Sequence, residues 1–221
     1  MSDYLKLIRW KNLLFIILIQ WLMQHAVVYP LLQTFGFETV QHHSFYLLLM
    51  AASVLIAAGG YVINDYFDVK IDRINKPTEV IAGEAVPLAS AMLLYQILTA
   101  LGTVTGLIIS FLSGSFTLGF IFILTPGLLW FYSASYKRQF LVGNLIVSLS
   151  SALSVLLVGV LAVALLNNEY SRDLLSQTPV PANIYGWTGG FAAFAFMLTW
   201  IREIIKDMED REGDMEMECR T

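Results

Sequence analysis

Carboxylate and amide side chains recur at three- and four-residue intervals in one short segment of a largely apolar chain, "NDYFDVKID". If the segment is helical, residues three and four apart lie on one face, with a rise of about 1.5 Å per residue. Like charges one turn apart repel each other, and the C-terminal end of a helix disfavours anions. A divalent cation would reverse this cost, because Mg²⁺ prefers oxygen ligands. The candidate ligands here are Asn64, Asp65, Asp68 and Asp72.

A second segment, "KDMEDREGD", repeats this pattern further along the chain. Asp210 and Asp214 are four residues apart, and Asp207 precedes Asp210 by three. Each segment follows a long apolar stretch, so both clusters are expected at helix ends. The alternative is a pair of solvated acidic loops, the first partly neutralised by Lys70 and Arg73. Two such loops at matching positions would be a coincidence, whereas two opposed clusters predict one site for metal-bound phosphate.

Basic and polar residues form a third group that could hold phosphate oxygens. Lys and Arg side chains bind such oxygens, and Arg does so with a bidentate fork. Basic flanks are also typical of the cytoplasmic ends of membrane spans, so both interpretations stay open for this group. The candidate phosphate-binding residues are Arg9, Asn12, Tyr136, Lys137, Arg138 and Asn144.

The elements that must position these residues are membrane-spanning helices. Of the 221 residues, 57% are apolar, and the mean hydropathy is +0.67, which is typical of the membrane class. Apolar stretches of about 20 residues are long enough to span a bilayer as helices. We therefore predict an all-α, polytopic transmembrane helix bundle that forms a single domain over residues 1–221. Its six expected spans cover roughly residues 12–33, 43–64, 88–112, 115–133, 141–166 and 186–205.

The distribution of basic residues predicts the topology of these spans. The first apolar run is too long for a signal peptide and no cleavage site follows it, so we expect a retained span. With the N-terminus in the cytoplasm, only Arg172 of the 13 Lys and Arg residues falls outside, as the positive-inside rule requires. Both acidic clusters then lie at the cytoplasmic face of the plasma membrane, at the ends of the second and sixth spans.

Acidic clusters, basic residues and an apolar bundle on one membrane face predict the ionisation of a lipid diphosphate. Mg²⁺ would neutralise the charge that grows on the leaving diphosphate, and the bundle would keep water from the isoprenoid carbocation. A divalent-cation transporter would need ionisable residues near the bilayer midplane, but spans three to five carry no acidic residue in their interiors. A net charge of −4 without a basic stripe argues against nucleic acid. The single cysteine, Cys219, excludes an internal disulfide.

The motifs resemble those of the UbiA-type intramembrane prenyltransferases. "NDYFDVKID" resembles the NDxxDxxxD motif of that family, "DREGD" resembles its second DxxxD motif, and "YKR…GN" lies between them. The resemblance implies transfer of a prenyl group from a prenyl diphosphate to an acceptor, with Mg²⁺ as the cofactor. It also implies that Lys137 and Arg138 contact the diphosphate, with Tyr136 and Arg9 nearby. The implied catalytic residues, which face each other across two metal ions with Asp65 and Asp207 in support, are Asn64, Asp68, Asp72, Asp210 and Asp214, together with Lys137.

Within that family, "NDYFDVKIDRINKP" and "REIIKDMEDREGD" look most like the branch that transfers a geranylgeranyl group to geranylgeranylglyceryl phosphate in ether-lipid synthesis. The alternative acceptors are the 4-hydroxybenzoate- or naphthoate-type aromatics of quinone biosynthesis. Members of the family usually have nine spans, so we expect this chain to lack the last three. A truncated homologue that binds a lipid diphosphate without turnover is therefore a further alternative.

Overall fold

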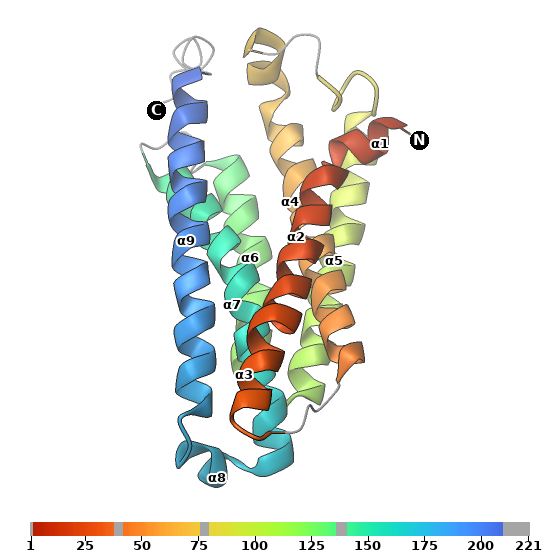
Figure 1. Cartoon of the computed structure of the whole chain (residues 1–221). Helices are drawn as coiled ribbons and strands as arrows, with labels where there is room; N and C mark the ends of the chain where they lie inside the picture. Colours follow the sequence, from red (N-terminus) through yellow and green to blue (C-terminus); the bar gives the residue numbers. More distant parts are fainter. Residues whose placement is uncertain (1, 38–41, 76–79, 136–140, 210–221) are drawn as a thin grey trace.

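The computed structural model describes residues 2–37, 42–75, 80–135 and 141–209. These ranges contain long helices and no β-strand, which confirms the predicted all-α class (Figure 1). The elements are α1 (Ser2–Leu7), α2 (Trp10–Leu22), the π-helix η1 (Met23–Val28), α3 (Tyr29–Thr34), α4 (His43–Asn75), α5 (Leu88–Leu112), α6 (Phe116–Ala134), α7 (Val142–Tyr170), α8 (Arg172–Ser176) and α9 (Val180–Glu209).

Six helical segments of the described chain are long and apolar enough to cross a membrane, so the predicted number and order of spans are confirmed. The first span is built from three consecutive elements, α2, η1 and α3. The spans cover Trp10–Thr34, His43–Ile74, Leu88–Leu112, Phe116–Ala134, Val142–Tyr170 and Val180–Glu209.

Two predicted boundaries were wrong, because a helix continues past its apolar stretch until a residue breaks it. The sequence predicted that the second span ends near residue 64, but α4 runs on to Asn75, just before Pro77. The residue before a proline disfavours the helical conformation. The sixth span begins at Val180 rather than near residue 186. Pro181 stands in its first turn, where a proline is tolerated because the first amide groups of a helix have no partner there.

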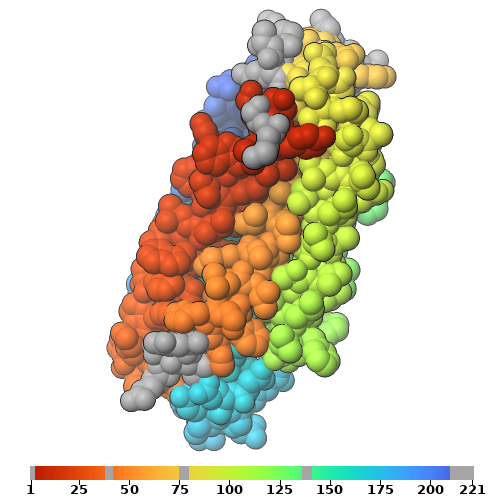
Figure 2. Space-filling view, turned by 90° about the vertical axis from the view of Figure 1, so that its right-hand side faces the viewer, coloured from red at the N-terminus to blue at the C-terminus, as the bar shows by residue number. Residues whose placement is uncertain are grey.

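Small residues allow the spans to pack closely. The GxxxG pair Gly102 and Gly106 predicts close helix packing, and both residues are buried in α5. A Cβ atom at Gly102 would collide with Ile56 of α4, and one at Gly106 would collide with Phe122 of α6. The main hydrophobic core continues through α7, where Leu161 is fully buried. Figure 2 shows α2, α4 and α5 side by side along one face of the bundle.

Both motif-bearing helices end at the same end of the bundle. The C-terminal turns of α4 and α9 lie at the top of Figure 1, as does α1, whereas α8 lies at the opposite end. Between α1 and α2 the chain makes a sharp bend, because Arg9 adopts a left-handed backbone conformation with φ 51°. This bend places the Arg9 side chain beside α4, as described next.

Candidate active site

The first acidic motif forms one face of the last turns of α4. The side-chain amide of Asn64 donates a 2.7 Å hydrogen bond to Oδ2 of Asp68, as expected for side chains four residues apart in a helix. Asp68 is buried, at 4% exposure, and Asp72 is half-buried one turn further on. The oxygen of the Asn64 amide, Oδ1, is buried and accepts no hydrogen bond within the described residues. The motif therefore presents an oxygen atom that lacks a partner beside a buried carboxylate.

Arg9 is held against the same helix by an ion pair with Asp65. Its Nη2 donates to Oδ1 of Asp65 over 2.7 Å, and the guanidinium lies over the ring of Tyr61, 5.1 Å from the ring centre. Burial disfavours the charged guanidinium, but the neighbouring Asp65 outweighs this effect, so the pKa of Arg9 is raised above its usual value. The structure thus places Arg9 among the motif residues, and its contact with a diphosphate stays a prediction.

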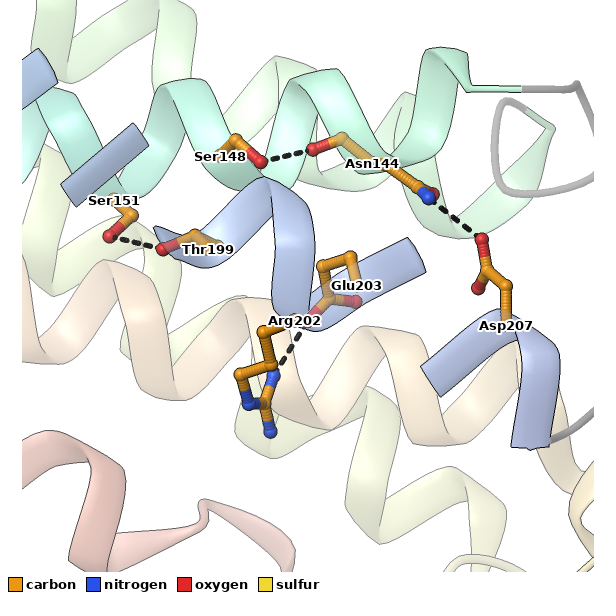
Figure 3. Close-up of polar contacts among 7 residues, drawn as sticks. All are labelled: Asn144, Ser148, Ser151, Thr199, Arg202, Glu203 and Asp207. Atoms are coloured by element: carbon orange, nitrogen blue, oxygen red, sulfur yellow. Dashed lines mark hydrogen bonds and ion pairs between the residues drawn. The ribbon is translucent and has the colours of Figure 1, made fainter. Parts of the chain in front are cut away.

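Asn144 and Asp207 join α7 to the second motif helix. The Asn144 side-chain amide donates a 2.7 Å hydrogen bond to Oδ2 of Asp207 (Figure 3). The Asn144 carbonyl oxygen accepts a hydrogen bond from Ser148 Oγ, one turn further along α7. The sequence assigned Asp207 to the metal group and Asn144 to the phosphate group, whereas the structure pairs the two residues directly.

Of the remaining predicted site residues, the structure describes Asn12. Asn12 is half-buried in the first turn of α2, where its backbone N–H donates to the Arg9 carbonyl oxygen. The other predicted residues, Tyr136, Lys137, Arg138, Asp210 and Asp214, lie outside the described residues.

The donor set of the described part of the site suits a hard cation such as Mg²⁺. Such ions take carboxylate and amide oxygen ligands, and Asn64 Oδ1 is a buried oxygen with no other partner in the described ranges. The carboxylate of Asp68 lies beside it. The described residues contain no group of three His, Cys, Asp or Glu side chains arranged to hold a metal. The resemblance assigns two further ligands to Asp210 and Asp214, which lie beyond these residues.

Sequence reasoning missed three side chains in this region. Tyr61 supports Arg9, and no local pattern distinguishes it from other aromatic residues of a span. Arg202 and Glu203 form a pair in α9, with a distance of 2.6 Å between Nη1 and Oε1. The signal for this pair was present in the sequence, because adjacent opposite charges inside an apolar span are expensive unless they serve a function.

Fold and site together define a polytopic membrane protein with carboxylate-bearing helices that end on one side of its bundle. The chain belongs to the UbiA prenyltransferase family, whose family model matches residues 26–221.

Similar proteins carry the name digeranylgeranylglyceryl phosphate synthase. The protein of this name from Ignicoccus hospitalis is 39% identical over 171 residues, which cover 77% of this chain and 50% of that protein. The one from Sulfolobus acidocaldarius is 38% identical over 170 residues, 77% of this chain and 53% of that protein. The chain thus spans about half the length of the curated relatives that it matches.

A solved structure has the same fold as this chain. It is described as "Structural and mechanistic insights into the biosynthesis of Digeranylgeranylglyceryl phosphate synthase in membranes". The similarity has a TM-score of 0.63 at 27% identity and covers 100% of this chain and 67% of that one. The six spans described above are therefore arranged as in part of a longer protein of the same family.

Proposed function

We propose that the protein transfers a geranylgeranyl group from geranylgeranyl diphosphate to geranylgeranylglyceryl phosphate. The observation that carries this proposal is the position of both acidic motif helices at one end of a membrane-spanning bundle of the UbiA family. The shared name of the curated relatives supports the choice of donor and acceptor.

We further propose Mg²⁺ as the cofactor. Asn64, Asp68 and Asp72 would hold it on α4, with Asp210 and Asp214 opposite and with Asp65 and Asp207 in support. Bound there, the metal would offset the negative charge that grows on the departing diphosphate.

The residues of the chain would act by binding, orienting and excluding water. In the transfer, the bond between C1 of the geranylgeranyl group and the diphosphate oxygen breaks, and its electron pair leaves with the diphosphate. The acceptor hydroxyl oxygen forms the new bond to C1, so the products are an ether, diphosphate and one proton. Lys137 and Arg138 would contact the diphosphate, and the apolar walls of the bundle would shield the cationic C1 from water.

The reaction would take place at the cytoplasmic face of the membrane. The support for this orientation is the positive-inside rule, because the ends of the bundle differ strongly in their content of Lys and Arg. The motif helices α4 and α9 end on the side that this rule assigns to the cytoplasm.

The proposal is tested by an activity assay on the 221-residue chain in detergent. The chain receives geranylgeranyl diphosphate, Mg²⁺ and one of three acceptors: geranylgeranylglyceryl phosphate, 4-hydroxybenzoate or a naphthoate. We expect an ether product with the first acceptor alone, and product with an aromatic acceptor alone would overturn the assignment of the acceptor. Donor binding is measured in the same samples, and Mg²⁺-dependent binding without any product would identify a homologue that binds the diphosphate but does not transfer it.

A further inference from the structure

The Arg202–Glu203 pair of α9 is a charged feature of the bundle that the proposed metal site does not use. Arg202 Nη1 donates a 2.6 Å hydrogen bond to Glu203 Oε1. The Glu203 side chain is 8% exposed, whereas the Arg202 side chain is 70% exposed. Burying a carboxylate costs free energy unless it is paired, and ionisable residues inside a membrane span usually serve a function. The pair is therefore a candidate functional feature of the span.

Arg202 lies on the flank of α9 beside the buried Glu203, and its own side chain is largely exposed. Ala195 precedes it by two helical turns and packs against the main hydrophobic core, which includes Met23 of the first span. Residues seven apart share a helix face, so Arg202 continues the face of Ala195. Figure 3 shows that its side chain leaves α9 on the side away from the contact between Asn144 and Asp207. The guanidinium is thus exposed on this flank of α9, where a ligand can reach it.

The pair has the chemistry of an anion-binding site. Side chains of consecutive helix residues normally point in different directions, so the Arg202 side chain must bend towards Glu203 to form this bond. The bond therefore fixes the orientation of the Arg202 guanidinium. This bond uses one of the five N–H donors of the guanidinium. A preoriented guanidinium binds phosphate oxygens with paired, charge-assisted hydrogen bonds.

We propose that Arg202 binds the phosphate group of the acceptor lipid and that Glu203 is the positioning residue that orients it. The proposal rests on the proposed function, which assigns the donor diphosphate to the carboxylate motifs. Arg202 precedes Asp207 by five residues, which places it roughly 7 Å further from the end of α9. This distance along α9 separates the Arg202 guanidinium from the proposed diphosphate site. A second anion could therefore bind Arg202 while the diphosphate is bound at the carboxylate motifs. The phosphate of a bulk membrane phospholipid offers the same chemistry, so the experiment must distinguish the two sources.

The kinetic test compares two acceptors that differ only in the phosphate. R202Q should raise the KM for geranylgeranylglyceryl phosphate about tenfold or more, the loss expected for a charge-assisted contact. The KM for geranylgeranyl diphosphate should change by less than about twofold. The weaker reaction with geranylgeranylglycerol, which lacks the phosphate, should not change. R202K should recover part of the loss, and the control R172Q removes the same charge at the opposite end of the bundle, on α8. An equal loss with both acceptors would overturn the proposal.

A binding measurement tests Arg202 without turnover and therefore independently of the proposed reaction. The full chain in phosphatidylcholine nanodiscs is titrated with geranylgeranylglyceryl phosphate in the absence of donor. R202Q should weaken this binding about tenfold or more. Replacing part of the phosphatidylcholine with phosphatidylglycerol should leave the difference intact. If the anionic phospholipid abolishes the difference, Arg202 binds bulk lipid and the proposal fails.

The positioning role of Glu203 is tested by comparing E203Q with R202Q and with the double variant. E203Q should raise the KM for the phosphorylated acceptor by less than R202Q does and should leave kcat within about twofold. The double variant should be no worse than R202Q alone, because a positioning residue has no effect once the residue that it orients is removed. Additive losses, or a fall in kcat with an unchanged KM, would contradict the positioning role. If the wild-type chain transfers nothing, the proposed function fails, and the binding measurement still decides the role of Arg202.

Discussion

Asn144 and Asp207 are 63 residues apart in the chain, yet the amide of the first donates to the carboxylate of the second over 2.7 Å. The bond ties the first turn of α7 to the last turn of α9, one turn before the "DREGD" segment begins. A side-chain amide donor adds no charge to the site, so this bond fixes the direction of the Asp207 carboxylate by hydrogen bonding alone. We therefore expect Asn144 to orient Asp207 in support of the second motif.

We expect N144A to lower Mg²⁺ affinity or kcat by about tenfold to a hundredfold, the usual cost of losing a residue that orients a metal-binding carboxylate. The measurement is transfer rate as a function of Mg²⁺ concentration. N183A is the matched control, because the Asn183 amide donates to the Pro179 carbonyl oxygen at the opposite end of α9. An unchanged Mg²⁺ dependence in N144A would show that the orientation of Asp207 has no part in metal binding.

The Arg9–Asp65 pair should stabilise the fold measurably, because Asp65 is largely buried, with 15% of its side chain exposed. A double-mutant cycle with R9Q and D65N should give a coupling free energy of unfolding of about 1–2 kcal/mol. The matched control is the Arg73–Glu84 pair, whose side chains are both more than half exposed. It should couple by less than about 1 kcal/mol. Both coupling free energies are measured by unfolding in mixed detergent micelles. Equal values for the two pairs would show that the Arg9–Asp65 pair stabilises the fold no more than an exposed ion pair does.

The sequence predicts the six spans well because their apolar length is a property of each segment alone. The helix ends are harder to predict, because hydropathy reports the side chains whereas the helix ends where its backbone is broken. Asp68 is the clearest case, because this carboxylate lies beyond the apolar stretch and is nevertheless a buried residue of α4. The spacing of the motif residues predicted the helix better than hydropathy did, because Asn64 and Asp68 are four residues apart and form the hydrogen bond expected at that interval in a helix.

The pairings between helices could not be predicted from one sequence. Whether Asn144 reaches Asp207 depends on the register of α7 against α9, which many apolar contacts determine together. Arg9 posed the same difficulty, because its contact with Asp65 requires the left-handed turn at Arg9 itself. A non-glycine residue rarely adopts that conformation, so local propensity gave no reason to expect it.

The close packing of α5 against α6 should make Gly106 sensitive to substitution. A Cβ atom there would collide with Phe122, so G106A should lower the free energy of unfolding by about 1–3 kcal/mol. G127A is the matched control, since a Cβ atom at Gly127 meets nothing within 4 Å. It should leave stability unchanged or raise it by up to about 1 kcal/mol, because Ala favours helix over Gly. Similar losses in both variants would show that the packing at Gly106 is looser than the structure indicates.

Removal of the metal and removal of one carboxylate charge should have the same consequence. EDTA should stop prenyl transfer and excess Mg²⁺ should restore it. D68N keeps an oxygen that can accept the hydrogen bond from Asn64 but loses the charge that holds the cation, so its transfer rate should fall at least about a hundredfold. The control D173N removes a carboxylate from α8 at the other end of the bundle and should retain the wild-type rate. A chelator-insensitive wild-type rate would refute the metal role, and full activity of D68N would remove Asp68 from the site. If both variants keep their secondary structure by circular dichroism, the loss in D68N is chemical, because the shape of the side chain and its bond to Asn64 are preserved.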